Sequence, residues 1–268
     1  MGRLSLVALL LAACGNDPAA QLRFTADPGA PGSEEYLCFG FDAGVLGGAD
    51  IGGLVLDAPA GPVTLHHVSL YASTTKIGAG PVECEQMPAD AVSLHVWALG
   101  TGDLALAPDL AIAVPEGTTQ LIVQAHALRG EDGPAQQAAI AIETRRDAEH
   151  RAAWLPLRVP TPAINPHQRT TSSAECAIDG ELHVISTWPH MHRLGIEFHG
   201  SFVDVVPYSY DAQHAYDVDA TVEAGGVIES ACTWFNPTDD VVLPGPLLSD
   251  EMCEQSLIAW PAEAARCR

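Results

Sequence analysis

Short β-type segments separated by turn residues recur along the whole chain, and this rhythm constrains the fold more than any other feature. The first half contains YLCFGFDAG, VTLHHVSLYAS and LIVQAHAL, and the second half contains ELHVISTW and IEFHGSFVDVV. Clusters of Gly, Pro and Asp lie between the segments, and no long stretch has helical periodicity. The pattern predicts an all-β protein with two tandem antiparallel β-sandwich domains of jelly-roll-like type.

The charge cluster RRDAEHR at residues 145–151 and the proline-rich passage PTPAINPHQRTT that follows lie between the two sets of segments, and they indicate a domain boundary near residue 150. A chain of 268 residues is long enough for two domains with hydrophobic cores. We expect a first domain over residues 34–150 and a second over residues 151–268. Residues 15–33 are rich in Pro, Gly, Ala and Asp, and we expect a tether without regular structure there.

The first residues have the pattern of an export signal, with Arg3, an apolar stretch and then small residues. The sequence LAACG resembles the lipobox of bacterial lipoproteins, which predicts a signal over residues 1–14 and a lipid-anchored Cys14. An ordinary cleaved signal with an incidental cysteine is the alternative. We expect an exported protein in the bacterial periplasm or on the cell surface. Only the lipid would hold it at the membrane, because no later apolar run approaches about 20 residues.

Charge and cysteine usage exclude several classes of function. The formal charge of −22, with Lys76 the only lysine, repels phosphate backbones, so nucleic-acid binding is not expected. Six of the seven cysteines remain after Cys14, and an even number in an exported chain indicates disulfides rather than thiolate metal sites. No CxxC spacing occurs, which argues against a zinc ribbon or a thioredoxin-type motif.

Two histidines stand two residues apart in the strand-type segment HVISTWPHMH, at His190 and His192. Because side chains i and i+2 of a strand point to one face, the two imidazoles form half of a metal site. The best candidate for a third ligand is Met252 in SDEMC. Two imidazoles and a thioether suit copper, since the soft sulfur favours Cu(I). A packed or surface pair of histidines is the alternative.

The first half contains adjacent His66 and His67 in VTLHHVSLY, and His126 in LIVQAHAL. Neighbouring side chains of a strand normally point to opposite faces. Binding of one ion by all three histidines therefore requires a local bulge or twist, or the use of different ring nitrogens. From these residues alone, a packed core histidine beside a surface histidine is the default interpretation.

Together, the HH pair, the QAH strand, the HMHRLG stretch and the segment SACTWFNPTDD…SDEMC resemble the copper type II, ascorbate-dependent monooxygenases. Dopamine β-hydroxylase and peptidylglycine α-hydroxylating monooxygenase belong to this family. The resemblance keeps the same order from Glu35 to Pro261. It implies two copper ions per chain, with a solvent-filled cleft between the domains. The electron-storage copper would be bound by His66, His67 and His126, and the oxygen-activating, catalytic copper by His190, His192 and Met252.

The resemblance also implies the chemistry. Ascorbate, or another one-electron donor, would reduce both coppers, and O2 would be used to hydroxylate a C–H bond of a small molecule or peptide. It further implies the disulfides Cys232–Cys253 and Cys176–Cys267, which leaves Cys38 for Cys84. The carboxylate clamp of the amidating enzyme is missing, so peptide amidation is not expected. The corresponding positions are Trp188, Glu254, Gln255 and Ser256.

Two functions of other classes stay open. An exported copper-binding lipoprotein could store or buffer the metal without catalysis. A β-sandwich adhesion or scaffold module could carry incidental histidines. Copper stoichiometry and ascorbate-driven turnover distinguish the three possibilities.

Overall fold

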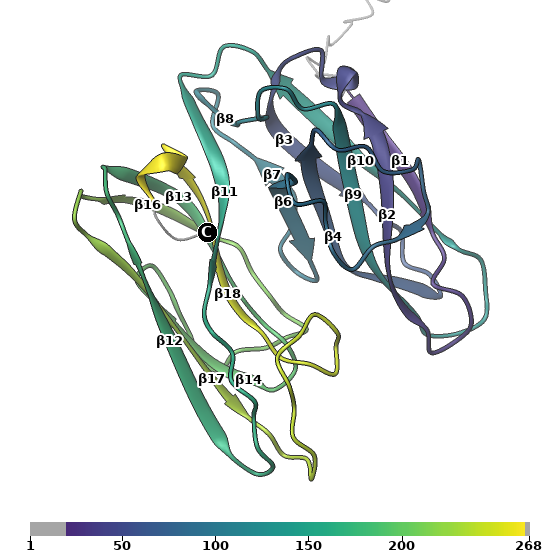
Figure 1. The fold of residues 1–268 in the computed structure, drawn as a ribbon, viewed down its shortest axis with the longest axis vertical. Coiled ribbons are helices and arrows are strands. Elements are labelled where there is room, and N and C mark those ends of the chain that lie inside the picture. Colours follow the sequence, from purple (N-terminus) through teal and green to yellow (C-terminus); the bar gives the residue numbers. More distant parts are fainter. Residues whose placement is uncertain (1–19, 266–268) are drawn as a thin grey trace, which may run out of the picture.

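The computed structural model describes residues 20–265 and is built almost entirely from strands (Figure 1). Strands account for 55% of the chain and helix for 3%, so the expected all-β sandwich fold is confirmed. In the part of the chain that is described, no helix has the length and apolar character needed to cross a membrane. The predicted signal over residues 1–14, with Cys14, lies outside the described residues.

The first sandwich contains ten strands and one short 3-10 helix, η1 (Ala43–Leu46). The strands are β1 (Ala20–Ala26), β2 (Glu34–Asp42), β3 (Asp50–Asp57), β4 (Val63–Ser73), β5 (Val82–Glu83), β6 (Val92–Ala98), β7 (Leu104–Ala105), β8 (Leu110–Ile112), β9 (Gln120–Arg129) and β10 (Gln136–Arg145). One sheet has the order β1-β10-β3-β8, with β7 paired to β3. The facing sheet has the order β5-β2-β9-β4-β6.

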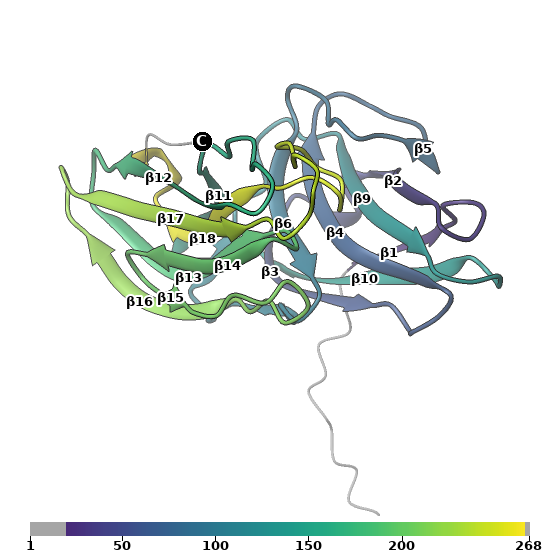
Figure 2. The ribbon, with the colours of Figure 1, turned by 90° about the horizontal axis from the view of Figure 1, so that it is seen from below.

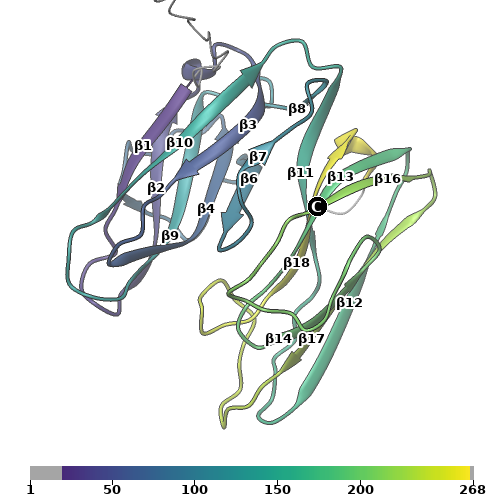
Figure 3. The same ribbon diagram turned by 180° about the vertical axis from the view of Figure 1, so that it is seen from behind.

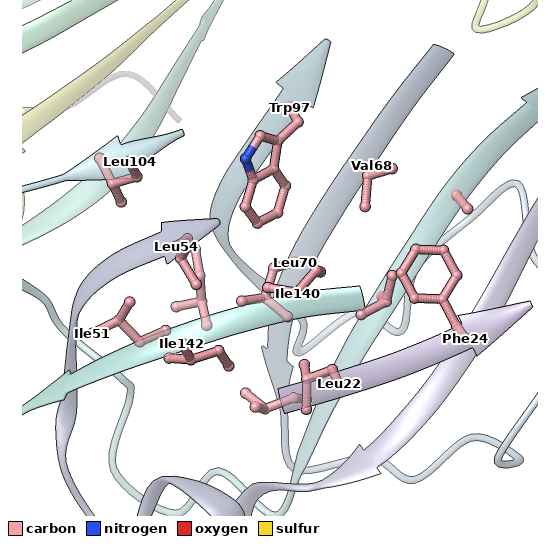
Figure 4. Packing of buried hydrophobic residues seen from close by; sticks show 14 of the residues in the cluster. Leu22, Phe24, Ile51, Leu54, Val68, Leu70, Trp97, Leu104, Ile140 and Ile142 are labelled. Carbon is pink, nitrogen blue, oxygen red and sulfur yellow. The ribbon is translucent and has the colours of Figure 1, made fainter. Parts of the chain in front are cut away.

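The core of this sandwich lies between its two sheets (Figure 4). Leu22 of β1 and Ile140 of β10 meet Leu70 of β4 there, and all three are almost fully buried. Alternate residues of β9, including Val123 and Ala125, face the same core. Since side chains alternate along a strand, the residues between them, His126 among them, face away from the core. That outer face of the sheet is turned to the second sandwich.

The expected tether over residues 15–33 is wrong for its central part, because Ala20–Ala26 form strand β1. β1 pairs with β10 along its whole length, from Ala20 opposite Ile142 to Ala26 opposite Gln136. The sequence AQLRFTA alternates between buried and exposed positions, so its apolar side chains close one edge of the core. Flanking Pro and Gly residues obscured this two-residue period.

The second sandwich contains eight strands and the 3-10 helix η2 (Ala262–Ala264), and it lies beside the first (Figure 2). The strands are β11 (His150–Arg158), β12 (Arg169–Ala177), β13 (Leu182–Met191), β14 (Gly195–Gly200), β15 (Asp204–Val205), β16 (Tyr216–Val222), β17 (Val227–Phe235) and β18 (Cys253–Trp260). One sheet has the order β11-β18-β13-β16 and the other has the order β12-β17-β14-β15.

Strand β11 belongs to both sandwiches (Figure 3). Its first residues, His150–Ala152, pair with β8 in parallel. Its remaining residues, Ala153–Arg158, pair with β18 in the antiparallel sense. One sheet therefore continues from the first sandwich into the second, and the predicted boundary at residue 150 falls at the start of this shared strand. The continuity fixes how the two sandwiches face each other.

Two disulfides are present among the described residues. Cys38 of β2 is joined to Cys84, and Cys232 of β17 is joined to Cys253 of β18. Both expected pairings are confirmed, whereas Cys267, the partner expected for Cys176, lies outside the described residues. Disulfides persist in oxidising compartments, which indicates an exported protein.

Candidate metal centre

His66 and His67 share one face because β4 contains an extra residue at this point. In the pairing of β4 with β9, Leu65 stands opposite Ala127 and His67 opposite His126, so His66 has no partner of its own. A bulge of this kind places two residues against one and re-aims their side chains. The Nδ1 atoms of His66 and His67 lie 3.2 Å apart. This is the local bulge that a shared ion requires.

His126 completes a cluster of three imidazoles. One ring nitrogen from each of the three histidines lies within 4.8 Å of the others. His126 is fully buried and His66 is nearly so. Nδ1 of His126 and Nε2 of His66 and His67 are buried without a hydrogen-bond partner. Buried polar atoms are normally hydrogen-bonded, and a bound ion is one explanation for several unpaired nitrogen atoms at one place. The cluster could hold a metal ion.

Glu34 of β2 orients His126. Its Oε1 lies 2.7 Å from Nε2 of His126 and accepts the hydrogen bond that this nitrogen donates. The proton is thereby held on Nε2, and Nδ1 keeps its lone pair for a metal. The same Oε1 accepts a second hydrogen bond, 3.0 Å long, from the backbone N–H of Leu248 in the second sandwich. Tyr36 adds a stacked ring 4.2 Å from that of His126.

Burial keeps the three imidazoles neutral. Loss of solvent lowers the pKa of His66 to about 2 and moves the pKa of His67 well below its ordinary value. The pKa of His126 is also lowered by burial, although Glu34 acts in the opposite direction. Neutral imidazole is the form that binds metals, so the cluster is in its metal-binding state at neutral pH.

His190 and His192 form a second cluster at the end of β13. Nδ1 of His190 lies 2.8 Å from Oε1 of Gln213, and Nδ1 of His192 lies 3.0 Å from the carbonyl oxygen of Asp250. These acceptors hold the protons on Nδ1 and leave both Nε2 atoms for a metal. Burial lowers the pKa of each imidazole to about 4. Both rings are therefore neutral at pH 7.

The pairing of β13 with β18 brings the methionine to the same place. Met191 stands opposite Cys253, and the half-buried Met252 directly precedes Cys253 in the chain. The antiparallel register therefore carries Met252 alongside His192. The disulfide of Cys253 with Cys232 anchors the residue next to Met252. The backbone thus carries Met252, directly before β18, to the end of β13 that holds the two histidines.

Glu251 supports the second cluster through three hydrogen bonds that its carboxylate accepts. Its buried carboxylate accepts hydrogen bonds from the backbone N–H of His192 at 3.1 Å and of Leu194 at 2.6 Å. It also accepts one from Nε1 of Trp234 at 3.0 Å. Burial raises the pKa of Glu251 to about 7, while these donors favour the ionised form. The Glu251 side chain thus ties the segment that precedes Met252 to the turn that follows the HxH pair.

The two clusters touch. The rings of His67 and His190 have centroids 4.8 Å apart in an edge-on contact. Tyr210 lies between the sandwiches: its ring stacks on that of His66 at 4.8 Å and is edge-on to that of His192 at 6.3 Å. Its hydroxyl is buried without a hydrogen-bond partner. The solvent-filled cleft that the resemblance implies is therefore absent between these histidines. Its place is taken by side chains that pack against each other.

Several residues of this centre have no counterpart in the sequence interpretation. Glu34, Gln213 and Tyr210 stand in no recognisable motif, and they reach the histidines only through the fold. Glu251 was visible only as a neighbour of Met252. Trp188 is placed where the sequence suggests, two residues before His190, with its ring 5.0 Å from that imidazole. Glu254 lies opposite His190 in the ladder, as its position next to Cys253 indicates.

Comparison of the sequence with models of known protein families gives no match, and comparison with curated proteins gives none either.

Proposed function

We propose that this protein is a copper-dependent monooxygenase that hydroxylates a C–H bond of a small molecule or peptide. The observation that carries the proposal is the ring contact between two buried clusters of neutral imidazoles. One cluster has three histidines with orphaned ring nitrogens, and the other has two histidines beside a methionine. A storage role alone does not require two such clusters to meet.

The donor set suits copper better than other metals. Imidazole serves both oxidation states of copper, and a thioether favours Cu(I), whereas structural zinc is usually held with thiolates. Among the described residues no free thiolate lies near either cluster, because Cys38 is joined to Cys84 and Cys253 to Cys232. When bound, copper would supply one-electron redox chemistry and oxygen activation. Two clusters in contact match a reaction that needs two electrons delivered one at a time.

The overall reaction balances as C–H plus O2, two electrons and two protons giving C–OH and one water. Ascorbate or another one-electron donor would supply the electrons. The chain's own residues prepare the site: Glu34 and Gln213 hold the tautomers of His126 and His190. Trp188 and Tyr210 fill the space around the clusters with apolar rings and keep water from it.

Copper content per chain, followed by ascorbate-dependent oxygen uptake, tests the proposal. Wild type should bind two coppers and consume oxygen in the presence of a substrate. Met252→Ala should lose most of the uptake while the three-histidine cluster keeps its copper. His199→Ala is the control, since His199 is half-exposed on β14 and pairs only with Asp204 among the described residues.

The outcomes separate the candidate functions. Two tightly bound coppers without oxygen uptake, across a broad substrate screen, would identify a copper buffer instead. Failure of the folded, disulfide-intact protein to bind copper would leave only a scaffold role. Met252→Ala with full uptake would overturn the assignment of the oxygen chemistry to the second cluster.

We further propose that lipid on Cys14 anchors the exported protein. The proposal is supported by the LAACG sequence and by an oxidising location. Incorporation of a labelled fatty acid into wild type, and its loss in Cys14→Ser together with release from the membrane fraction, tests it. Unchanged labelling in Cys14→Ser would refute the anchor.

A further inference from the structure

A cavity of about 210 Å³ lies where β6 and β7 of the first sandwich meet β13 and β18 of the second. Its wall combines indole and aliphatic side chains, including Trp154, Trp188 and Ile258, with polar residues such as His95 and Ser256. No lysine or arginine is among the described residues that line it. Its volume is below the range typical of sites for drug-sized ligands. The cavity therefore suits a small ligand without negative charge.

His95 gives this cavity an unusual polar feature. Only 7% of the residue is exposed, and neither ring nitrogen has a hydrogen-bond partner. The ring lies edge-on to Trp97 and Trp154, with centroid distances of 4.5 and 5.2 Å. Burial lowers the pKa of His95 to about 3, so the imidazole is neutral and offers one donor and one acceptor. His95 lines the cavity, so a ligand that reaches its ring would find two hydrogen-bonding atoms that no other group uses.

Trp188 connects the cavity to the metal centre. Its ring lines the cavity, and its centroid lies 5.0 Å from that of His190 and 6.4 Å from that of His67. The indole N–H of Trp188 is also buried without a partner. Trp154 stands behind it, 5.9 Å away. A molecule in the cavity is thus separated from both histidine clusters by the width of one ring.

We propose that this cavity is a ligand site beside the copper centre, and that its ligand is a small neutral molecule with a flat ring and a hydrogen-bonding group. The inference rests on the proposed function. The ring would stack against the indoles of Trp154 and Trp188, and the polar group would pair with His95. Carboxylate and phosphate ligands would have no cationic partner among the described residues that line the cavity. Exposed Asp217 at the rim makes an anion less favourable still.

Indole is a suitable probe, because it combines a flat ring with one N–H donor. Its binding to the metal-free full-length protein can be measured by calorimetry, with 1-methylindole and benzoate as comparisons. Wild type should bind indole about tenfold more tightly than 1-methylindole, since only indole can donate to His95. His95→Phe should remove this difference. Benzoate should not bind.

A second variant tests the same site in case His95→Phe does not fold. Ala215 is exposed and lines the cavity, so Ala215→Trp should block the site while leaving the thermal midpoint unchanged. Exposed His199 supplies the matched control, His199→Phe, which should bind indole as wild type does. Indole binding that survives in Ala215→Trp, or that is absent from wild type, would overturn the proposed site.

Proximity to the metal centre needs a separate measurement. In protein loaded with Cu(II), the proton relaxation of bound indole should be strongly enhanced, and the enhancement should vanish in Ala215→Trp. Indole bound without enhancement in a copper-loaded sample would refute the link to the metal centre. Because indole binding is measured without metal, it is independent of copper binding. A protein that binds indole but no copper would refute the proposed function and leave the cavity as a ligand site.

Discussion

Replacement of Glu34 provides the sharpest test of how the three-histidine cluster is built. Oε1 of Glu34 accepts hydrogen bonds from Nε2 of His126 and from the N–H of Leu248, at 2.7 and 3.0 Å. Carboxylates that hold a ligating histidine typically contribute 10- to 100-fold to metal affinity, or about 1.4–2.7 kcal/mol. Glu34→Gln keeps an acceptor oxygen but loses the charge, so we expect about tenfold weaker copper binding. Glu34→Ala loses both the acceptor and the charge, so its copper binding should be weaker by about 100-fold, the upper end of this range.

The assay is a competition titration of Cu(I) against a coloured chelator. It should be done in a His192→Ala background, so that only the three-histidine cluster binds copper. Glu35→Gln is the matched control: it makes the same charge change one residue along β2, and strand alternation turns its side chain to the other face. Wild-type affinity in Glu34→Ala, or equal loss in Glu35→Gln, would show that the carboxylate does not orient His126.

Three further predictions concern stability and the second cluster. His95 is neutral in the folded protein, with a pKa of about 3 against an ordinary value of 6.5, so the unfolded state binds more protons as the pH falls below 6.5. In urea unfolding, His95 alone should therefore contribute a fall in stability of up to about 1.4 kcal/mol per pH unit between pH 6 and 4, in addition to the contributions of the other buried histidines, and His95→Phe should remove that part of the slope. The double replacement of Cys232 and Cys253 by serine should cost about 3 kcal/mol, because the closed loop spans 21 residues, and should also weaken copper binding beside Met252. Glu251→Gln should weaken copper binding at the second cluster about tenfold, as measured by the same titration in a His126→Ala background. The first cluster, measured in the His192→Ala background, should keep its affinity.

The features that could be predicted from the sequence are those with a local period. The all-β class follows from short alternating segments, and the shared face of His190 and His192 follows from the two-residue repeat of a strand. Strand β1 has the same repeat, yet it is only seven residues long and is flanked by Pro and Gly, which favour a tether. The bulge at His66 is a different case. It depends on the register between β4 and β9, and no local pattern contains that register.

The residues that orient the ligands could not be predicted, because their partners are remote. Glu34 is 92 positions from His126 and 214 positions from Leu248. A glutamate in a strand-type segment is ordinarily a solvated side chain, and only the paired sheets bring this one to an imidazole. Glu251 stands beside a predicted ligand, but its three hydrogen bonds to His192, Leu194 and Trp234 require the turn after β13 to close over β17 and β18.

The contact between the two clusters has a physical origin in the apolar faces around them. Trp188 and Ile258, on β13 and β18, belong to the same hydrophobic cluster as the core of the first sandwich, and Trp154 on the shared strand β11 joins them. Burial of these side chains favours closure of the two faces. The histidines accept the contact because they are neutral: a charged imidazole would lose its hydration and repel its neighbour. The low pKa values of His67 and His190 and the contact between their rings therefore have one cause, which is the exclusion of water by the apolar side chains beside them.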